Sequence, residues 1–360
     1  MENKRRPLHS TKYPGIKKFV FIMIACVWML ALILILEVGA QLKFKNRKQL
    51  PSQYSANLQV RRVSEAFHAD LWKTPWREYK PNSSAKYSAE GITYEANINS
   101  IGFRGKEIPK TEGNSYIIAC IGGSTTVKGG SDSTTYPALL QEILNKENPK
   151  KYTVINGGVS GRISNEYGST IETLLDQVHP DIVIEYNAVN DICWRLFHHW
   201  RKQLNLVERL LLKSQFIKYF FGDYFLPDER TIRRDIDRIT MENLRSIASR
   251  LGQHGIQFSV SSFLYPSPDT ISKDQYAYLD HNLRYWWKSD YISYRKYCYI
   301  VDIYNKMLKE TFEETEAWFI PLAETGDYPF DFFTDVTHMN SRGIRVKANN
   351  MANLIRHRLK

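Results

Sequence analysis

A serine that directly follows two glycines has the sequence surroundings of a nucleophile. The apolar run 116–121 ends at Gly122 and Gly123, and Ser124 comes next, ahead of a helical pattern. Two glycines allow a sharp bend that exposes a hydroxyl at the carboxyl edge of a sheet, with the serine N–H directed toward a bound anion. An ordinary turn followed by a helix N-cap has the same pattern, so the serine alone does not establish catalysis.

A histidine and a carboxylate near the other end of the chain are the partners that such a serine requires. Asp335 precedes His338 by three residues. On one turn, this spacing lets the carboxylate reach one imidazole nitrogen while the other nitrogen points outward. His338 would then accept the proton of Ser124 as a general base. The alternative is that Asp335 is a helix N-cap and His338 is one of nine histidines without a catalytic role.

Two further polar segments follow short apolar runs. The run 152–156 leads to Gly161, and the run 181–186 leads to Asn190. In a parallel sheet the carboxyl ends of the strands meet at one edge, so these residues are expected near Ser124. The N–H groups of Ser124 and Gly161 and the side-chain amide of Asn190 are predicted to bind the oxygen of a tetrahedral intermediate.

Taken in order, these four motifs resemble those of the SGNH hydrolases, also called GDSL-type esterases, over about residues 97–358. The resemblance implies a three-layer α/β/α fold, flavodoxin-like, with a mostly parallel sheet. By the family pattern, Ser124 is the nucleophile, Asp335 and His338 are the orienting acid and the base, and Ser124, Gly161 and Asn190 form the oxyanion hole.

The chain departs from the family pattern at two of the motifs. The family's Gly-Asp-Ser is Gly-Gly-Ser at 122–124, and its Gly-x-Asn-Asp is Ala-Val-Asn-Asp at 188–191. Neither change removes a catalytic atom, but both indicate a divergent branch. The segment 99–105 resembles a lead-in of some bacterial members; its Arg104 is expected to form a structural salt bridge, with an acidic group of the substrate as the alternative.

An apolar run near the N-terminus predicts a membrane anchor. Residues 19–36 are 18 consecutive apolar residues, and six of the first 18 residues are Lys or Arg. This length suits a transmembrane helix, and the basic tail favours a cytoplasmic N-terminus with the body of the chain outside the cytoplasm. We assign 1–18 to the tail and 19–40 to a signal-anchor. The small residues at 38–40 also fit a signal-peptidase site, so removal of the helix stays open.

The net charge of +11 is concentrated beside this helix. Residues 1–62 carry 12 basic and 2 acidic side chains, whereas residues 63–360 carry 37 and 36. The basic character therefore indicates topology and contact with anionic lipid, and a nucleic-acid partner is not expected.

Cysteine and histidine spacings favour neither disulfides nor a metal. Cys26 lies in the apolar run, and the three others, Cys120, Cys193 and Cys298, lack the spacing of a disulfide framework. His198 and His199 have no further ligand at a suitable spacing. No cofactor is expected, and the oligomeric state is left open.

The remaining residues are expected to form one domain at 96–360, joined to the anchor by a stalk at 41–95. Alternating strands and helices predict a parallel sheet with helices on both faces. The expected strands are 116–121, 152–156, 181–186, 257–264 and 298–303, and the main helices are 136–145, 163–177, 241–251 and 342–359.

Two insertions are predicted in this domain. The insertion at 195–235 holds apolar, Lys/Arg-flanked stretches that suit a lid, a face resting on a bilayer, or a helix pair packed on the core. The insertion at 270–297 holds Trp286 and Trp287, which suit stacking on sugar rings or ordinary packing.

Together these features predict a membrane-anchored serine esterase that acts outside the cytoplasm on O-acyl groups of carbohydrate or lipid. An O-acyltransferase would use the same residues, because both reactions share the acyl-enzyme. A non-catalytic component of an envelope polysaccharide assembly is the alternative from a different class.

Overall fold

The computed structural model describes residues 14–46, 71–73, 78–89, 92–108, 115–146, 151–287, 289–326 and 328–359. Most of the predicted basic tail (1–13) and residues 47–70 of the predicted stalk lie outside the described residues. The predicted division into tail, anchor, stalk and domain stays a prediction.

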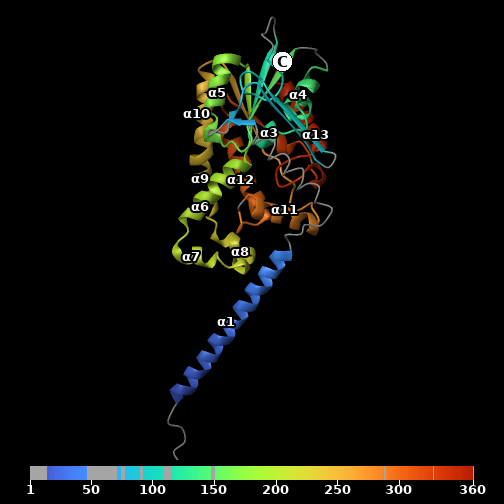
Figure 1. The fold of residues 1–360 in the computed structure, drawn as a ribbon. Coiled ribbons are helices and arrows are strands. Elements are labelled where there is room, and N and C mark those ends of the chain that lie inside the picture. The colour runs from blue at the N-terminus through green and yellow to red at the C-terminus, as the bar shows by residue number, and fades with distance from the viewer. Residues whose placement is uncertain are drawn as a thin grey trace, which may run out of the picture.

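A long helix, α1 (Pro14–Asn46), extends away from the rest of the chain (Figure 1). Within it, residues 18–43 are long and apolar enough to cross a membrane, and the 18-residue window that meets this criterion is not buried against the protein. An unbroken apolar run of this length favours a helix, because a helix forms all of its backbone hydrogen bonds within the segment itself in hydrocarbon.

The centre of the domain is a parallel sheet of five strands in the order β6-β5-β7-β8-β9. The strands are β5 (Tyr116–Gly122), β6 (Tyr152–Gly158), β7 (Ile182–Tyr186), β8 (Gln257–Ser261) and β9 (Trp318–Ile320). Strand β7 is buried along its whole length and β5 is buried from its second residue, as expected for strands covered on both faces. This order is the flavodoxin-like one, and the predicted α/β class is confirmed.

Helices cover both faces of the sheet (Figure 1). Helices α4 (Tyr136–Leu144) and α13 (Ser341–Arg356) pack against each other on one face. The opposite face is covered by α5 (Gly168–Thr173), α10 (Glu242–Gly252) and α12 (Tyr294–Phe312). Short helical segments extend or connect these elements: α3 (Ser124–Val127), π-helical turns at 174–178, 191–196 and 237–241, and 3-10 turns at 132–134, 164–166, 222–225, 322–324 and 330–332.

The prediction of a strand at 298–303 is wrong. This segment lies inside α12, and β9 at 318–320 is the fifth strand. The buried positions of α12 include Tyr297, Val301, Tyr304 and Leu308, which recur every three or four residues. That spacing places them on one face of a helix that is 19 residues long.

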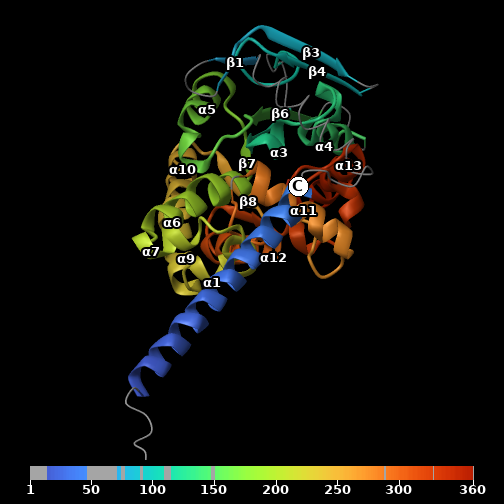
Figure 2. The same ribbon diagram turned by 60° about the horizontal axis from the view of Figure 1, so that its bottom comes forward.

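An antiparallel hairpin lies largely within the predicted stalk. Strands β3 (Ser83–Ala89) and β4 (Ile92–Ile98) pair along their full length, and β4 crosses the predicted boundary at 95/96. The hairpin lies at the end of the domain opposite α1 (Figure 2). A second, smaller core joins it and the short pair β1 (Trp72–Lys73) and β2 (Glu78–Tyr79) to the sheet; its buried residues are Leu71, Tyr79, Ala96, Ile98, Val127 and Val159.

Both predicted insertions are helical. The first contains α6 (Phe197–Gln203), α7 (Leu206–Leu211), α8 (Gln215–Phe221) and α9 (Glu229–Ile236). The second contains α11 (Lys273–Trp286) and the beginning of α12.

Candidate active site

Two glycines bring Ser124 to the carboxyl edge of the sheet. Gly122 ends β5 at φ 152°, where a Cβ would lie 2.4 Å from the carbonyl oxygen of Tyr186. At Gly123 a Cβ would lie 2.3 Å from Nδ2 of Asn190. Positions 122 and 123 therefore leave no room for a side chain, and glycine is the residue that fits there. Gly123 is the N-cap of α3 and Ser124 is its first residue, so the serine side chain does not serve as the cap.

Ser124, His338 and Asp335 lie in hydrogen-bonding contact. The distance from Ser124 Oγ to His338 Nε2 is 2.8 Å, and the distance from His338 Nδ1 to Asp335 Oδ2 is 2.7 Å. A carboxylate only accepts, so Nδ1–H donates to Asp335 and leaves Nε2 as the acceptor for the Ser124 hydroxyl. All three residues are at least 91% buried, which excludes most water from these contacts.

A tight turn, and not a helix, orients Asp335. The N–H groups of Thr337 and His338 donate to Asp335 Oδ1 over 2.9 and 2.7 Å. Helix α13 begins only later, with Asn340 as its N-cap. The backbone therefore fixes one carboxylate oxygen while the other faces the imidazole.

Asn190 is held beside the serine turn by the segment that follows β6. Its Nδ2 donates to the carbonyl oxygen of Arg162 over 2.9 Å, and Asn187 Nδ2 donates to the same oxygen over 3.1 Å. A Cβ at position 123 would lie 2.3 Å from this nitrogen, so the Asn190 amide is packed against the turn that carries Ser124.

Gly161 lies in the turn between β6 and Arg162, with φ 78°. This turn is joined to the turn that carries Ser124, since the N–H of Val159 donates to the carbonyl oxygen of Gly122 over 3.0 Å. The structure thus brings the segments of Gly161 and Asn190 to the same sheet edge as Ser124.

Asp191 stabilises this arrangement through hydrogen bonds to Ser164. Its carboxylate accepts the N–H of Ser164 over 3.1 Å and the Ser164 hydroxyl over 2.8 Å. Burial raises the pKa of Asp191 to about 6, an effect that the hydrogen bonds from Ser164 partly offset. This aspartate joins the loop after β6 to the segment after β7.

A cavity of about 360 Å³ opens at Ser124 and His338. One wall comes from β4, through Thr93 and Tyr94, and another comes from the segment 128–130. The hairpin that the sequence assigned to a stalk therefore forms part of the candidate site.

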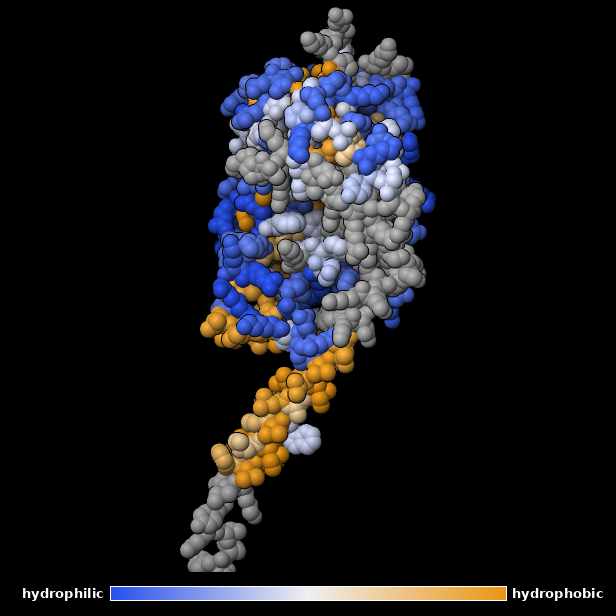
Figure 3. Space-filling view, viewed as in Figure 1, coloured by the Kyte–Doolittle hydropathy of each residue, from blue (hydrophilic) through white to orange (hydrophobic). Residues whose placement is uncertain are grey.

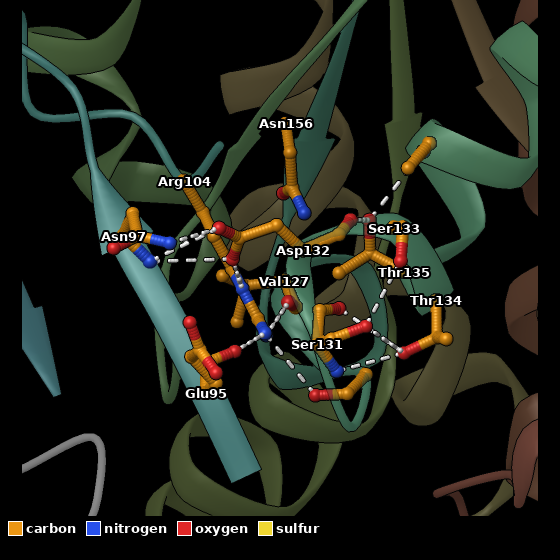
Figure 4. A network of polar contacts seen from close by, with 12 residues as sticks. Glu95, Asn97, Arg104, Val127, Ser131, Asp132, Ser133, Thr134, Thr135 and Asn156 are labelled. Atoms are coloured by element: carbon orange, nitrogen blue, oxygen red, sulfur yellow. Dashed lines mark hydrogen bonds and ion pairs between the residues drawn. The ribbon is translucent and has the colours of Figure 1, made fainter. Parts of the chain in front are cut away.

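Arg104 holds this wall in place (Figure 4). Its Nε donates to Asp132 over 3.0 Å, and its guanidinium also donates to the carbonyl oxygens of Glu95, Val127 and Gly129. Asp132 in turn accepts the side-chain amide of Asn97 over 2.8 Å. The prediction of a structural salt bridge for Arg104 is confirmed, and the network connects β4 to the loop after α3.

Lys347 of α13 and Trp287 of the second insertion complete the surroundings of Ser124 and His338. Lys347 is buried; its Nζ donates to the carbonyl oxygen of Thr125 over 2.8 Å, and burial lowers its pKa to about 7. The ring of Trp287 stacks on His338 with centroids 6.3 Å apart and an angle of 21° between the planes. Neither contact was predicted, because a lysine in a helix and a tryptophan in an aromatic segment have no distinctive spacing.

Among the residues that the structure describes, no three His, Cys, Asp or Glu side chains gather in a way that could hold a metal ion.

No family model and no curated protein matches the chain. Solved structures that are similar in fold include GDSL-family esterases and acylhydrolases. An acetyl-xylooligosaccharide esterase mutant from Geobacillus Stearmophilus shows 19% identity and a TM-score of 0.41, covering 68% of this chain and 95% of its own. A carbohydrate acetylesterase family member from Sinorhizobium meliloti shows 12% identity and a TM-score of 0.41, with 68% and 99% covered. An esterase from Pseudoalteromonas shows 13% identity and a TM-score of 0.40, with 68% and 99% covered.

Proposed function

We propose that this chain is a divergent SGNH-type serine hydrolase that cleaves ester bonds. The observation that carries the proposal is the continuous contact from Ser124 Oγ through the imidazole of His338 to the carboxylate of Asp335. This order of groups activates a hydroxyl, because the base is within reach of the proton and is itself fixed in one tautomer.

The first half-reaction forms an acyl-enzyme. Ser124 Oγ attacks the ester carbonyl as its proton passes to His338 Nε2, and Asp335 stabilises the imidazolium. The negative charge on the former carbonyl oxygen would be bound by the N–H groups of Ser124 and Gly161 and by Asn190 Nδ2. When the carbon–oxygen bond breaks, the proton on His338 passes to the leaving alcohol.

The second half-reaction returns the enzyme to its starting state. Water passes a proton to His338 as it attacks the acyl carbon, and the imidazolium then gives that proton to Ser124 Oγ as the acid leaves. A sugar hydroxyl in place of water would make the chain an O-acyltransferase. Measuring how the acyl group divides between water and an added glycan acceptor separates the two activities.

The substrate class that we propose is an O-acyl group of a carbohydrate, outside the cytoplasm, with a lipid ester as the second candidate. The cavity at Ser124 is lined by Thr93 and Tyr94 of β4, by the segment 128–130 and by residues from 334 to 347. Helices α3 and α13, which contribute residues to this lining, lie away from α1 (Figure 1). A water-exposed glycan reaches this side of the domain more directly than a lipid of the bilayer that α1 would enter.

An active-site probe tests the proposal. The full chain in nanodiscs should be labelled by a fluorophosphonate, and Ser124→Ala should abolish labelling. Ser124→Ala and His338→Ala should reduce turnover to similar low levels, because the residues act as a unit. A folded wild-type chain that is neither labelled nor active on any acyl ester, yet binds polysaccharide, would instead favour the non-catalytic assembly role.

A further inference from the structure

Exposed apolar side chains lie on α7, on α8 and on the 3-10 turn 222–225, and α8 contacts α1. These residues are between 47% and 83% exposed; they are Leu206, Val207, Leu210, Phe220, Phe221 and Tyr224. Figure 3 shows the apolar surface at the edge of the domain from which α1 leaves. We call this set the apolar patch. An exposed apolar patch of this kind usually marks a site of contact with another protein or with a membrane.

Hydrogen bonds fix the depth of α8 relative to α1. Glu37, the first residue after the apolar run 19–36, accepts the Ser214 hydroxyl over 2.6 Å and the N–H groups of Gln215 and Phe216 over 3.0 and 3.2 Å. At about 1.5 Å per residue, the 18-residue run spans about 27 Å, close to the thickness of a bilayer's hydrocarbon core. The beginning of α8 therefore lies at the boundary between hydrocarbon and headgroups whenever α1 crosses a membrane.

The domain holds α8 equally firmly from its other side. Arg284 donates to the carbonyl oxygen of Lys218 over 3.1 Å, and Asp223 accepts the N–H of Ser293 over 2.8 Å. At Gly222 a Cβ would lie 1.8 Å from the carbonyl oxygen of Tyr291, so the backbones are in direct contact there. Helix α8 and the turn 222–225 that follows it thus connect α1 to the α/β domain through direct contacts on both sides.

Exposed basic side chains lie on the helices of the patch and on the segments next to them in the chain. Lys202, Arg209 and Lys213 are exposed on and between α6, α7 and α8. Nζ of Lys43, on α1, lies 5.3 Å from the ring centroid of Tyr219. Apolar side chains with a border of Lys and Arg are typical of surfaces that insert shallowly into an anionic bilayer.

From this geometry we infer that the apolar patch rests on the lipid bilayer that α1 enters, inserting into its headgroup region and fixing the orientation of the domain. The inference concerns the contact with lipid and does not depend on the esterase activity. It also differs from a lid over the active site, since none of the described residues that line the cavity at Ser124 belongs to α7 or α8.

Spin labels on the full chain test the inference in vesicles of phosphatidylethanolamine and phosphatidylglycerol. Cys26 is the only exposed cysteine among the described residues, so labels are attached at Leu210→Cys and Tyr224→Cys in a Cys26→Ser background. A label on native Cys26 is the hydrocarbon reference, and a label at Lys86→Cys, on the far hairpin, is the water reference. Collision rates with oxygen and with a water-soluble nickel chelate report the surroundings of each label.

The labels at 210 and 224 should collide more with oxygen and less with nickel than the label at 86, approaching the values at Cys26. Values equal to those at Lys86→Cys would overturn the inference. Protection from both reagents, with spin–spin broadening that disappears when labelled chain is diluted with unlabelled chain, would also overturn it. That outcome would assign the patch to a contact between two copies.

Discussion

Replacing Lys347 by methionine should change how the stability of the domain depends on pH. Lys347 extends from α13 under the nucleophile turn, where its Nζ lies 4.2 and 4.3 Å from the ring centroids of Tyr136 and Tyr186. Methionine has a similar length and fills the same space without a titratable group. The substitution therefore removes the proton and leaves the packing nearly unchanged.

Burial lowers the pKa of Lys347 from 10.5 to about 7, and Cys120 acts weakly in the opposite direction. Between these two values the unfolded chain holds a proton that the folded chain lacks, so stability rises with pH. Burying the Lys347 ammonium lowers the unfolding free energy by about 5 kcal/mol below pH 7, and this loss disappears above pH 10.5. From pH 6 to pH 9, wild type should gain about 3 kcal/mol of unfolding free energy relative to Lys347→Met.

The groups that face Lys347 stay neutral in this window. Burial raises the pKa of the Cys120 thiol to about 12, and it raises the pKa values of Tyr136 and Tyr186 as well. Subtracting the variant from wild type cancels groups common to both proteins, including His338. The loss of the hydrogen bond to Thr125 adds an offset of about 1–3 kcal/mol that does not vary with pH.

Urea unfolding of the full chain in nanodiscs, followed by circular dichroism at several values from pH 6 to pH 9, gives the difference directly. The matched control is Lys306→Met, at an exposed position of α12, whose difference from wild type should stay constant. A constant or falling difference for Lys347→Met would refute the reasoning, because it would mean that the ammonium is solvated in the folded state.

Substitutions at three other positions test the site and its support. Gly123→Ala should lower kcat on a soluble acyl ester by about 10²–10³-fold. The new Cβ would lie 2.3 Å from Asn190 Nδ2 and would push this amide out of its position. Circular dichroism is the check on folding. Asp335→Asn should lower kcat by about 10⁴-fold by permitting the wrong tautomer of His338, and wild-type kinetics would contradict this role. Arg104→Met should lower the unfolding free energy by about 3 kcal/mol in urea, and Arg104→Lys should restore only part of it, since one ammonium cannot replace a fork of donors.

The candidate site could be predicted because its chemistry is encoded locally. Asp335 and His338 are three residues apart, and Gly123 directly precedes Ser124. Spacings this short keep the members of each pair close together, whereas the contact between Ser124 and His338 depends on the whole fold. The parallel sheet then required only that each motif follow a strand, which β5, β6 and β7 satisfy.

The last strand could not be predicted in the same way. The strand-like run 298–303 is too short to distinguish a strand from a buried helix, and the helical period becomes visible only over the 19 residues of α12. Strand β9 has three residues, which is too few to show any alternation. Its place at the edge of the sheet follows from pairing with β8.

The hairpin did leave a signal in the sequence. Ile92, Tyr94, Ala96 and Ile98 alternate with more polar residues, which is the period of a half-buried strand. Its role at the cavity had no such signal, because the contact of Thr93 and Tyr94 with the site depends on the distant pairing of Arg104 with Asp132.

The apolar patch and the cavity at Ser124 are separate surfaces with no residue in common among those described. Aspartate substitutions at Leu206 and Leu210 should therefore leave kcat on a soluble ester unchanged, since both side chains are exposed and neither lines the cavity at Ser124. The same substitutions would alter how the domain rests on the bilayer, because they place negative charge on the part of the apolar patch that α7 contributes. A loss of turnover confined to membrane-bound substrates would thus measure orientation, and a loss on soluble esters as well would mean that the patch supports the fold of the active site.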